Sequence, residues 1–174
     1  MHAKISKLFF TAAVSAVLVY SGYSADERPN RIGGGVHYWK TIDQIKKEHE
    51  SIDDDGIAWV VSYQRVISML KLEADLEIFP NGYAGSEDIA FSPQAFIGLG
   101  TAIYAALGIG TVYASDLDKK FSDPLFIARA GLDLALIPAL HLDINANYYF
   151  SKWENWDDFD TDTITLGGQV RFAF

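Results

Sequence analysis

The 174-residue chain contains no cysteine. It therefore forms no disulfide, supplies no thiolate nucleophile or zinc ligand of that type, and has no cysteine to carry a lipid anchor. Beyond its first residues it also lacks any apolar run of roughly 18 residues, so no membrane-spanning helix is expected there. A chain without such a helix crosses a membrane only as a closed barrel, because lipid leaves the backbone no other way to satisfy its hydrogen bonds.

Basic residues are in short supply as well. Lysine and arginine number 14 against 23 aspartates and glutamates, which gives a formal net charge of −9. Because nucleic-acid binding requires a basic surface to neutralise phosphates, no nucleic-acid partner is expected. Most of the acids lie in four stretches that we expect to connect strands, namely residues 41–56, 80–88, 116–124 and 152–162.

The N-terminus has the pattern of a secretory signal peptide. Lys4 and Lys7 precede an apolar run over residues 8–20 that is too short for a spanning helix. Small residues follow this run, and we expect cleavage between residues 24 and 26. The expected organisation is a signal peptide over residues 1–25 and a single domain over residues 26–174.

The last twelve residues alternate between two kinds of side chain, which indicates a strand with two chemically opposite faces. The apolar set is Ile164, Leu166, Val170, Phe172 and Phe174, and the other set is Thr163, Thr165, Gly167, Gln169 and Arg171. A strand that continues to the end of the chain and ends in phenylalanine is unusual in a soluble protein, whose ends tend to fray.

Eight strand-like segments follow the signal, and most approach the 9–11 residues with which a tilted strand crosses a bilayer. They span residues 33–40, 57–67, 70–79, 89–99, 102–115, 125–137, 140–151 and 163–174. Tight turns near residues 68–69, 100–101 and 138–139 alternate with the four long acidic connections. Short turns at one end and long loops at the other are typical of membrane β-barrels.

The size of the side chains indicates which face of the strands is outside. In the fifth segment Ile103, Leu107 and Ile109 alternate with Ala106 and Gly108. The interior of an eight-stranded barrel has room only for its own side chains, so the small residues fit inside and the bulky ones face lipid. The rival interpretation is a soluble periplasmic barrel with its apolar face inward.

Aromatic residues support the membrane interpretation, because amphipathic rings gather at the two interfaces of a bilayer. One group falls toward the long-loop ends of the segments, comprising Trp39, Trp59, Tyr113, Phe126, Tyr148, Phe150 and Trp153. Phe172 and Phe174 fall at the other rim.

The inward set of the third, sixth, seventh and eighth segments carries charges, including Lys71 and Glu77 in the third. We expect an interior ion-pair network, because ionised groups in a narrow barrel must be paired or hydrated. Its members are Glu73, Asp75, Arg129, Asp133, His141, Asp143 and Arg171. The alternative interpretations are a pore lining and a catalytic carboxylate pair.

The turn at Pro138 suggests two contacts within this network. A three-residue turn places Asp133 directly opposite Asp143, and two like charges in that position need a cation between them. If Phe172 pairs with Leu142, Arg171 lies beside Asp143 and supplies that cation.

No catalytic site, cofactor or metal centre is expected. His141, Asp143 and Ser62 share the inward face, but the sequence around His141 lacks the pattern of the small barrels that deacylate lipid A. Residues 158–162 resemble the start of a calcium loop, yet the sixth position is Thr163 and the twelfth is Gln169, so the loop fails as an EF-hand. Weak divalent-cation binding by these acids and by residues 53–55 is a separate hypothesis.

With the signal, the eight segments, the asymmetric connections and the ending Gly-Gly-Gln-Val-Arg-Phe-Ala-Phe over residues 167–174, the chain resembles the small eight-stranded outer-membrane β-barrel superfamily. The membrane domain of OmpA and the OmpX-like proteins are its types. The resemblance implies an all-β, eight-stranded antiparallel up-and-down transmembrane β-barrel in the outer membrane of a Gram-negative bacterium, reached after secretion to the periplasm. It also implies that Phe172 and Phe174 belong to the signal read by the barrel-assembly machinery.

The expected function is that of a non-enzymatic outer-membrane barrel with a plugged, ion-paired interior and acidic extracellular loops, in a structural or surface-interaction role. The expected partners are outer-membrane lipid and lipopolysaccharide, and a monomer suffices because a closed barrel has no free edges. The alternatives are a small pore for ions or solutes and a lipid-modifying enzyme.

Overall fold

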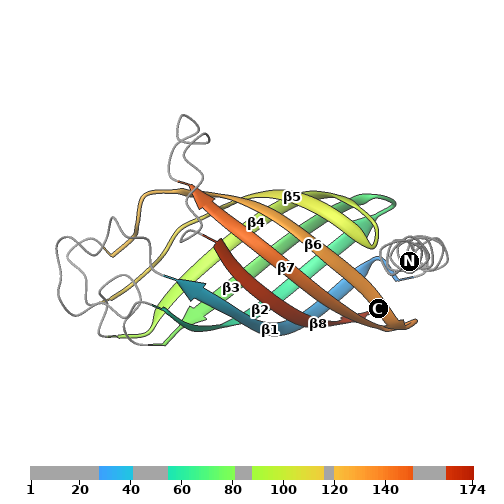
Figure 1. Ribbon diagram of the computed structural model, residues 1–174, viewed down its shortest axis with the longest axis horizontal. Coiled ribbons are helices and arrows are strands. Elements are labelled where there is room, and N and C mark those ends of the chain that lie inside the picture. The colour runs from blue at the N-terminus through green and yellow to red at the C-terminus, as the bar shows by residue number, and fades with distance from the viewer. Residues whose placement is uncertain (1–27, 41–54, 81–87, 116–119, 151–163) are drawn as a thin grey trace, which may run out of the picture.

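The computed structural model describes residues 28–40, 55–80, 88–115, 120–150 and 164–174. Its strands are β1 (Asn30–Lys40), β2 (Asp55–Ile67), β3 (Leu70–Phe79), β4 (Ala90–Gly100), β5 (Ile103–Gly110), β6 (Leu125–Ile137), β7 (Leu140–Phe150) and β8 (Ile164–Ala173). Each strand pairs antiparallel with its neighbours in the chain, and β8 pairs with β1, so the sheet closes (Figure 1). The predicted eight-stranded antiparallel up-and-down barrel is confirmed. Within the described ranges no helix has the length and apolar character to span a membrane.

The strand boundaries agree with the predicted ones to within three residues except at β5. The alternation predicted a strand to residue 115, but β5 ends at Gly110. The Val112 amide donates a hydrogen bond to Ser122 Oγ at 2.9 Å, and the Ser122 amide donates one to the Val112 carbonyl. These bonds draw the chain toward the segment that returns to β6. Tyr113 makes only isolated bridges, to Phe91 and to Phe121.

Three tight connections lie at one end of the barrel, together with the start of β1 and the end of β8, and we call it the tight-turn end (Figure 1). In the β4–β5 connection Gly100 has a φ of +130°, a conformation that only glycine adopts readily. A side chain there would also meet Tyr104 Cα at 2.7 Å. The opposite end, where the other connections leave the barrel, is called the long-loop end.

Burial largely alternates along the strands, with most polar side chains inside and most large apolar ones outside. In β3 the side chains of Lys71, Glu73, Asp75 and Glu77 are buried while Leu76 between the last two is exposed. Every strand contributes exposed large hydrophobic residues, for example Ile32, Ile57, Leu72, Ile97, Ile103, Leu132, Ile144 and Leu166. This arrangement is the reverse of a water-soluble barrel, in which the apolar face is buried.

Candidate functional site in the barrel interior

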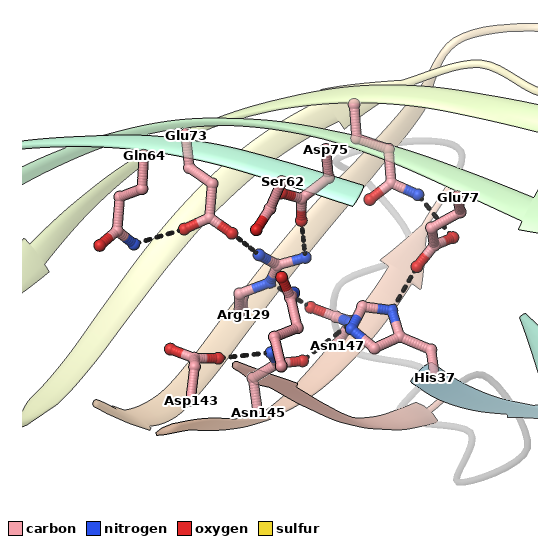
Figure 2. A network of polar contacts seen from close by, with 12 residues as sticks. His37, Ser62, Gln64, Glu73, Asp75, Glu77, Arg129, Asp143, Asn145 and Asn147 are labelled. Atoms are coloured by element: carbon pink, nitrogen blue, oxygen red, sulfur yellow. Dashed lines mark hydrogen bonds and ion pairs between the residues drawn. The ribbon is translucent and has the colours of Figure 1, made fainter. Parts of the chain in front are cut away.

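Two arginines form the centre of the interior. Arg129 extends from β6 to bind Glu73 at 2.7 Å and Asp75 at 2.9 Å, both on β3 (Figure 2). Arg171 reaches from β8 to the same carboxylate of Glu73, at 2.5 Å. Gln64 donates a further hydrogen bond to Glu73 at 2.6 Å. Glu73 thus joins three otherwise separate strands, β2 through Gln64, β6 through Arg129 and β8 through Arg171.

A second group lies at the tight-turn end around Asp133. Its carboxylate contacts Arg31 at 2.5 Å, Lys71, and the Nδ1 atom of His141 at 3.0 Å. Asp133 pairs with Asp143 across the β6–β7 ladder. Each carboxylate of this like-charged pair therefore needs its own cations, and Asp133 has Arg31 and Lys71.

Asp143 is the other member of that pair. Arg171 Nη1 lies 2.9 Å from its carboxylate, Tyr104 donates its hydroxyl at 3.0 Å, and Asn145 donates at 2.7 Å. The register expected here was wrong, because Phe172 pairs with Leu140 and not with Leu142. Arg171 is consequently opposite His141, and its long side chain reaches Asp143 diagonally along the sheet.

A third group lies toward the long-loop end around Glu77. His37 Nδ1 contacts one oxygen of this carboxylate, and Gln94 donates to the other at 2.8 Å (Figure 2). The hydroxyl of Tyr149 lies 3.5 Å from both oxygens. Glu77 therefore contacts one imidazole, one amide and one phenol, whereas the carboxylates nearer the tight-turn end contact arginine or lysine.

We call the charged interior residues and their hydrogen-bond partners the polar layer. Its charged members are Arg31, His37, Lys71, Glu73, Asp75, Glu77, Arg129, Asp133, His141, Asp143 and Arg171. Aromatic rings separate the groups within it. Arg129 lies over the ring of Phe96 at 3.7 Å, and the Lys71 ammonium lies 4.5 Å from the ring centre of Tyr104. Both contacts place a cation on the negative face of a ring.

Above the polar layer, at the long-loop end, the interior becomes apolar. Six buried residues pack together, and we call them the apolar plug: Trp39, Ala58, Phe79, Ala90, Val112 and Ala114. The rings of Trp39 and Phe79 meet edge to face, 6.3 Å apart. The expectation that Trp39 belongs to the outer aromatic group was wrong, because only 3% of it is exposed, whereas Trp59 is 62% exposed on the outside.

The residues predicted for the ion-pair network all lie inside the barrel, but they are not the whole network, and the predicted assembly residues Phe172 and Phe174 are exposed outside. Arg31, His37 and Tyr104 also take part in it and were not singled out from the sequence. Arg31 precedes the predicted start of its strand, which explains its omission. His37 and Tyr104 lie on the inward alternation of β1 and β5, and this alternation was the signal that could have found them.

The arrangement of the candidate catalytic groups does not form a triad. Ser62 Oγ accepts a hydrogen bond from Arg171 at 3.2 Å, while the ring of His141 bonds to Asp133. Within the described part of the chain, no group of three or more metal-ligating side chains is placed to hold an ion. The calcium-loop resemblance at residues 158–162, the acids at 53–54 and the predicted signal peptide lie outside the described residues.

Solved structures of bacterial barrel proteins resemble this chain, and three of them are compared with it below. The N-terminal β-barrel domain of OprF from Pseudomonas aeruginosa superposes with a TM-score of 0.53 at 10% identity, over 84% of this chain and 98% of that one. This chain has the fold of the OprF barrel domain. Neisserial surface protein A gives a TM-score of 0.49 at 15% identity, with 83% and 96% of the two chains covered. The Yersinia pestis outer membrane protein Ail gives 0.46 at 14% identity, with 85% and 100% covered.

The OprF-like fold confirms the predicted resemblance to small eight-stranded barrels at the level of architecture. No family model and no curated protein sequence matches the chain. At such low identity the similarity carries the fold and not the activity, so function has to be argued from the residues of this chain.

Proposed function

We propose that the chain is a β-barrel protein of the outer membrane of a Gram-negative bacterium. It would reach this membrane after secretion into the periplasm. The observation that supports this most strongly is the reversed burial. Charged residues such as Arg129 and Asp143 are buried inside, while large apolar residues are exposed on all eight strands. Water would disfavour such an outer surface, whereas a bilayer requires it.

The two rims of the barrel fit the same environment. Trp59 and Tyr38 are exposed on the outside toward the long-loop end, and Phe172 and Phe174 are exposed at the tight-turn end. Amphipathic and aromatic side chains at both ends of an apolar belt are typical of membrane barrels. We also propose that Phe172 and Phe174 form the signal for the barrel-assembly machinery, and that the barrel contacts outer-membrane lipid and lipopolysaccharide as a monomer.

We further propose that the barrel is not an enzyme and that its interior is filled. The support is that side chains of the polar layer are joined by ion pairs inside the barrel and that the residues of the apolar plug pack together nearer the long-loop end. Such a protein acts through its presence in the membrane or through its acidic connections, which the sequence places at the long-loop end. The interior histidines His37 and His141 contact the carboxylates of Glu77 and Asp133.

Membrane placement is tested by fractionation of expressing cells and by gel mobility with and without heating. We expect the protein in the outer-membrane fraction, with a mobility that changes on boiling because a closed barrel resists detergent. Recovery in the soluble periplasmic fraction with no heat-dependent mobility would contradict the proposal and favour the soluble barrel.

The filled interior is tested by single-channel recordings on the reconstituted protein. We expect no steady conductance, because ion pairs and apolar side chains leave no continuous aqueous path. A steady conductance that changes when Arg129 or Arg171 is replaced would instead show that the barrel is a pore. Mass analysis of lipid A with and without the protein tests for enzymatic activity, and an altered lipid A would overturn the non-enzymatic role.

A further inference from the structure

The interior changes from polar to apolar at one level of the barrel. On β1, β3 and β4 the last buried polar residue is followed, two positions nearer the long-loop end, by a buried apolar one. These pairs are His37 and Trp39, Glu77 and Phe79, and Ser92 and Ala90. Residues two apart on a strand point to the same side, so the three pairs mark a boundary on the side of the interior formed by β1, β3 and β4. The polar layer lies on one side of it and the apolar plug on the other.

The apolar plug is tightly packed. The indole of Trp39 lies over Gly56, where an added Cβ would come within 2.7 Å of the ring, and its edge meets Phe79. Leu125 packs against the plug from β6. Apart from the indole N–H of Trp39, no side chain in the plug carries a polar atom, so the plug offers water almost nothing to bind.

The polar layer has the opposite character, because its groups are linked from the tight-turn end upward. His141 contacts Asp133, Arg31 donates to both Asp133 and Gln64, and Gln64 donates to the central Glu73. These links run through charged and polar groups joined by hydrogen bonds. Such a series, with water between its members, is the medium through which protons move in proteins.

Toward the long-loop end the polar layer also contains buried polar atoms without a hydrogen-bond partner among the described residues. They include Asp75 Oδ1, Gln94 Oε1 and His37 Nε2, the last on a side chain that is 1% exposed. Buried polar atoms of this kind are normally satisfied by ordered water. These atoms lie between the Glu73 group and the boundary with the plug. Water bound to them is therefore expected to extend the series of hydrogen-bonded groups up to Glu77.

We propose that the apolar plug is the barrel's barrier to protons, and that the polar layer beneath it blocks larger ions but transmits protons. The inference rests on the proposed function, since it assumes a filled membrane barrel. A constriction lined by apolar side chains excludes water and so interrupts any proton path. The ion pairs of Glu73 with Arg129 and Arg171 leave no room for a hydrated ion, yet a proton needs only a chain of hydrogen bonds.

The test uses the purified protein reconstituted into liposomes that contain a pH-sensitive dye, with an imposed pH gradient and valinomycin to balance charge. The variant W39S/F79S wets the plug without touching the polar layer. We expect its proton flux to exceed that of the wild type by roughly tenfold, because the wetted constriction no longer interrupts the water chain. Its potassium flux, measured without valinomycin, should stay at the wild-type level.

The matched control is W59S/F91S, which removes the same two residue types near the same rim but from the outer surface. Its proton flux should equal that of the wild type. Heat-dependent gel mobility verifies that each variant is folded. If W39S/F79S does not fold, A58S/A114S adds two hydroxyl groups to the plug while keeping both rings, and its proton flux should also rise.

The outcomes separate this inference from the proposed function. Folded plug variants that remain as proton-tight as the wild type would overturn the inference. A proton leak in Glu73→Gln, whose plug is intact, would overturn it as well. Potassium conductance in the wild type would instead contradict the filled interior itself.

Discussion

Arg129 is the residue on which the interior depends most. It is almost fully buried, and its guanidinium binds Glu73, Asp75 and the Asn147 side-chain oxygen, the last at 2.6 Å. Removing one partner of a buried ion pair leaves the other charge uncompensated, which costs more than the pair itself contributes. The network is therefore sensitive to the loss of a single side chain.

We expect Arg129→Met to lower the free energy of unfolding by about 3–5 kcal/mol, because the buried carboxylate of Asp75 loses its cation and that of Glu73 keeps only Arg171. Urea titration of the protein folded into lipid vesicles measures the change. Arg65→Met is the control, since Arg65 is exposed on the outer surface near the tight-turn end. A change of similar size in both variants would show that burial of the charge is not the cause.

At the residue scale, sequence reasoning placed one contact correctly and one side chain wrongly. Asp133 lies opposite Asp143 as expected, although the register is reached through an irregularity between Ala135 and Ile137 and a two-residue turn, and not through a three-residue turn. Sequence reasoning failed for Trp39, although the alternation with His37 already placed this residue inside. The preference of tryptophan for membrane interfaces was given more weight than the alternation of inward and outward side chains along the strand. The alternation was the stronger signal.

The elements most dependent on close packing are β1 and β8, which close the barrel. Gly35 faces inward on β1, and a side chain there would overlap the Gly168 carbonyl and approach Gln169 Cα to 2.6 Å. These are backbone atoms of the neighbouring strand, so they cannot move aside without opening the ladder. Gly168 faces outward on β8, and its nearest obstacle is 4.0 Å away.

Gly35→Ala is therefore expected to destabilise the barrel by roughly 1–3 kcal/mol through overpacking, while Gly168→Ala should be neutral or slightly stabilising. The comparison needs only the urea midpoints of the two variants in the same lipid. Equal midpoints for both alanine variants would contradict the close approach of β1 and β8.

The lengths of the elements were predictable wherever side-chain alternation continued to the strand end, as in β3 and β6. The early end of β5 was not predictable, because the Val112 amide donates to Ser122, which lies 10 residues further along the chain. Register along β7 and β8 was also missed by two residues, since alternation is unchanged by a shift of two. The face that a side chain takes can be read from its own strand. The residue with which it pairs depends on the neighbouring strand, which the local sequence does not specify.

At the scale of the whole molecule, the architecture follows from a single requirement. Each of the eight strands has an apolar and a polar face. The narrow interior accommodates the face with small or ion-paired residues, so the face with bulky apolar residues lies outside. The apolar plug was not foreseen, because β1 to β4 contribute one residue each and the segment after β5 contributes Val112 and Ala114. Only the closed sheet brings them to one level.

The most direct test of this account distinguishes the two faces by tryptophan fluorescence. Of the four tryptophans, Trp39 lies in the plug and Trp59 on the outer surface, so variants that keep only one of them report each face separately. In vesicles of brominated phospholipid, which quench rings in contact with lipid, we expect strong quenching of the Trp59-only protein and none of the Trp39-only protein. Quenching of Trp39, or of neither residue, would contradict a lipid-embedded barrel with its polar face inside.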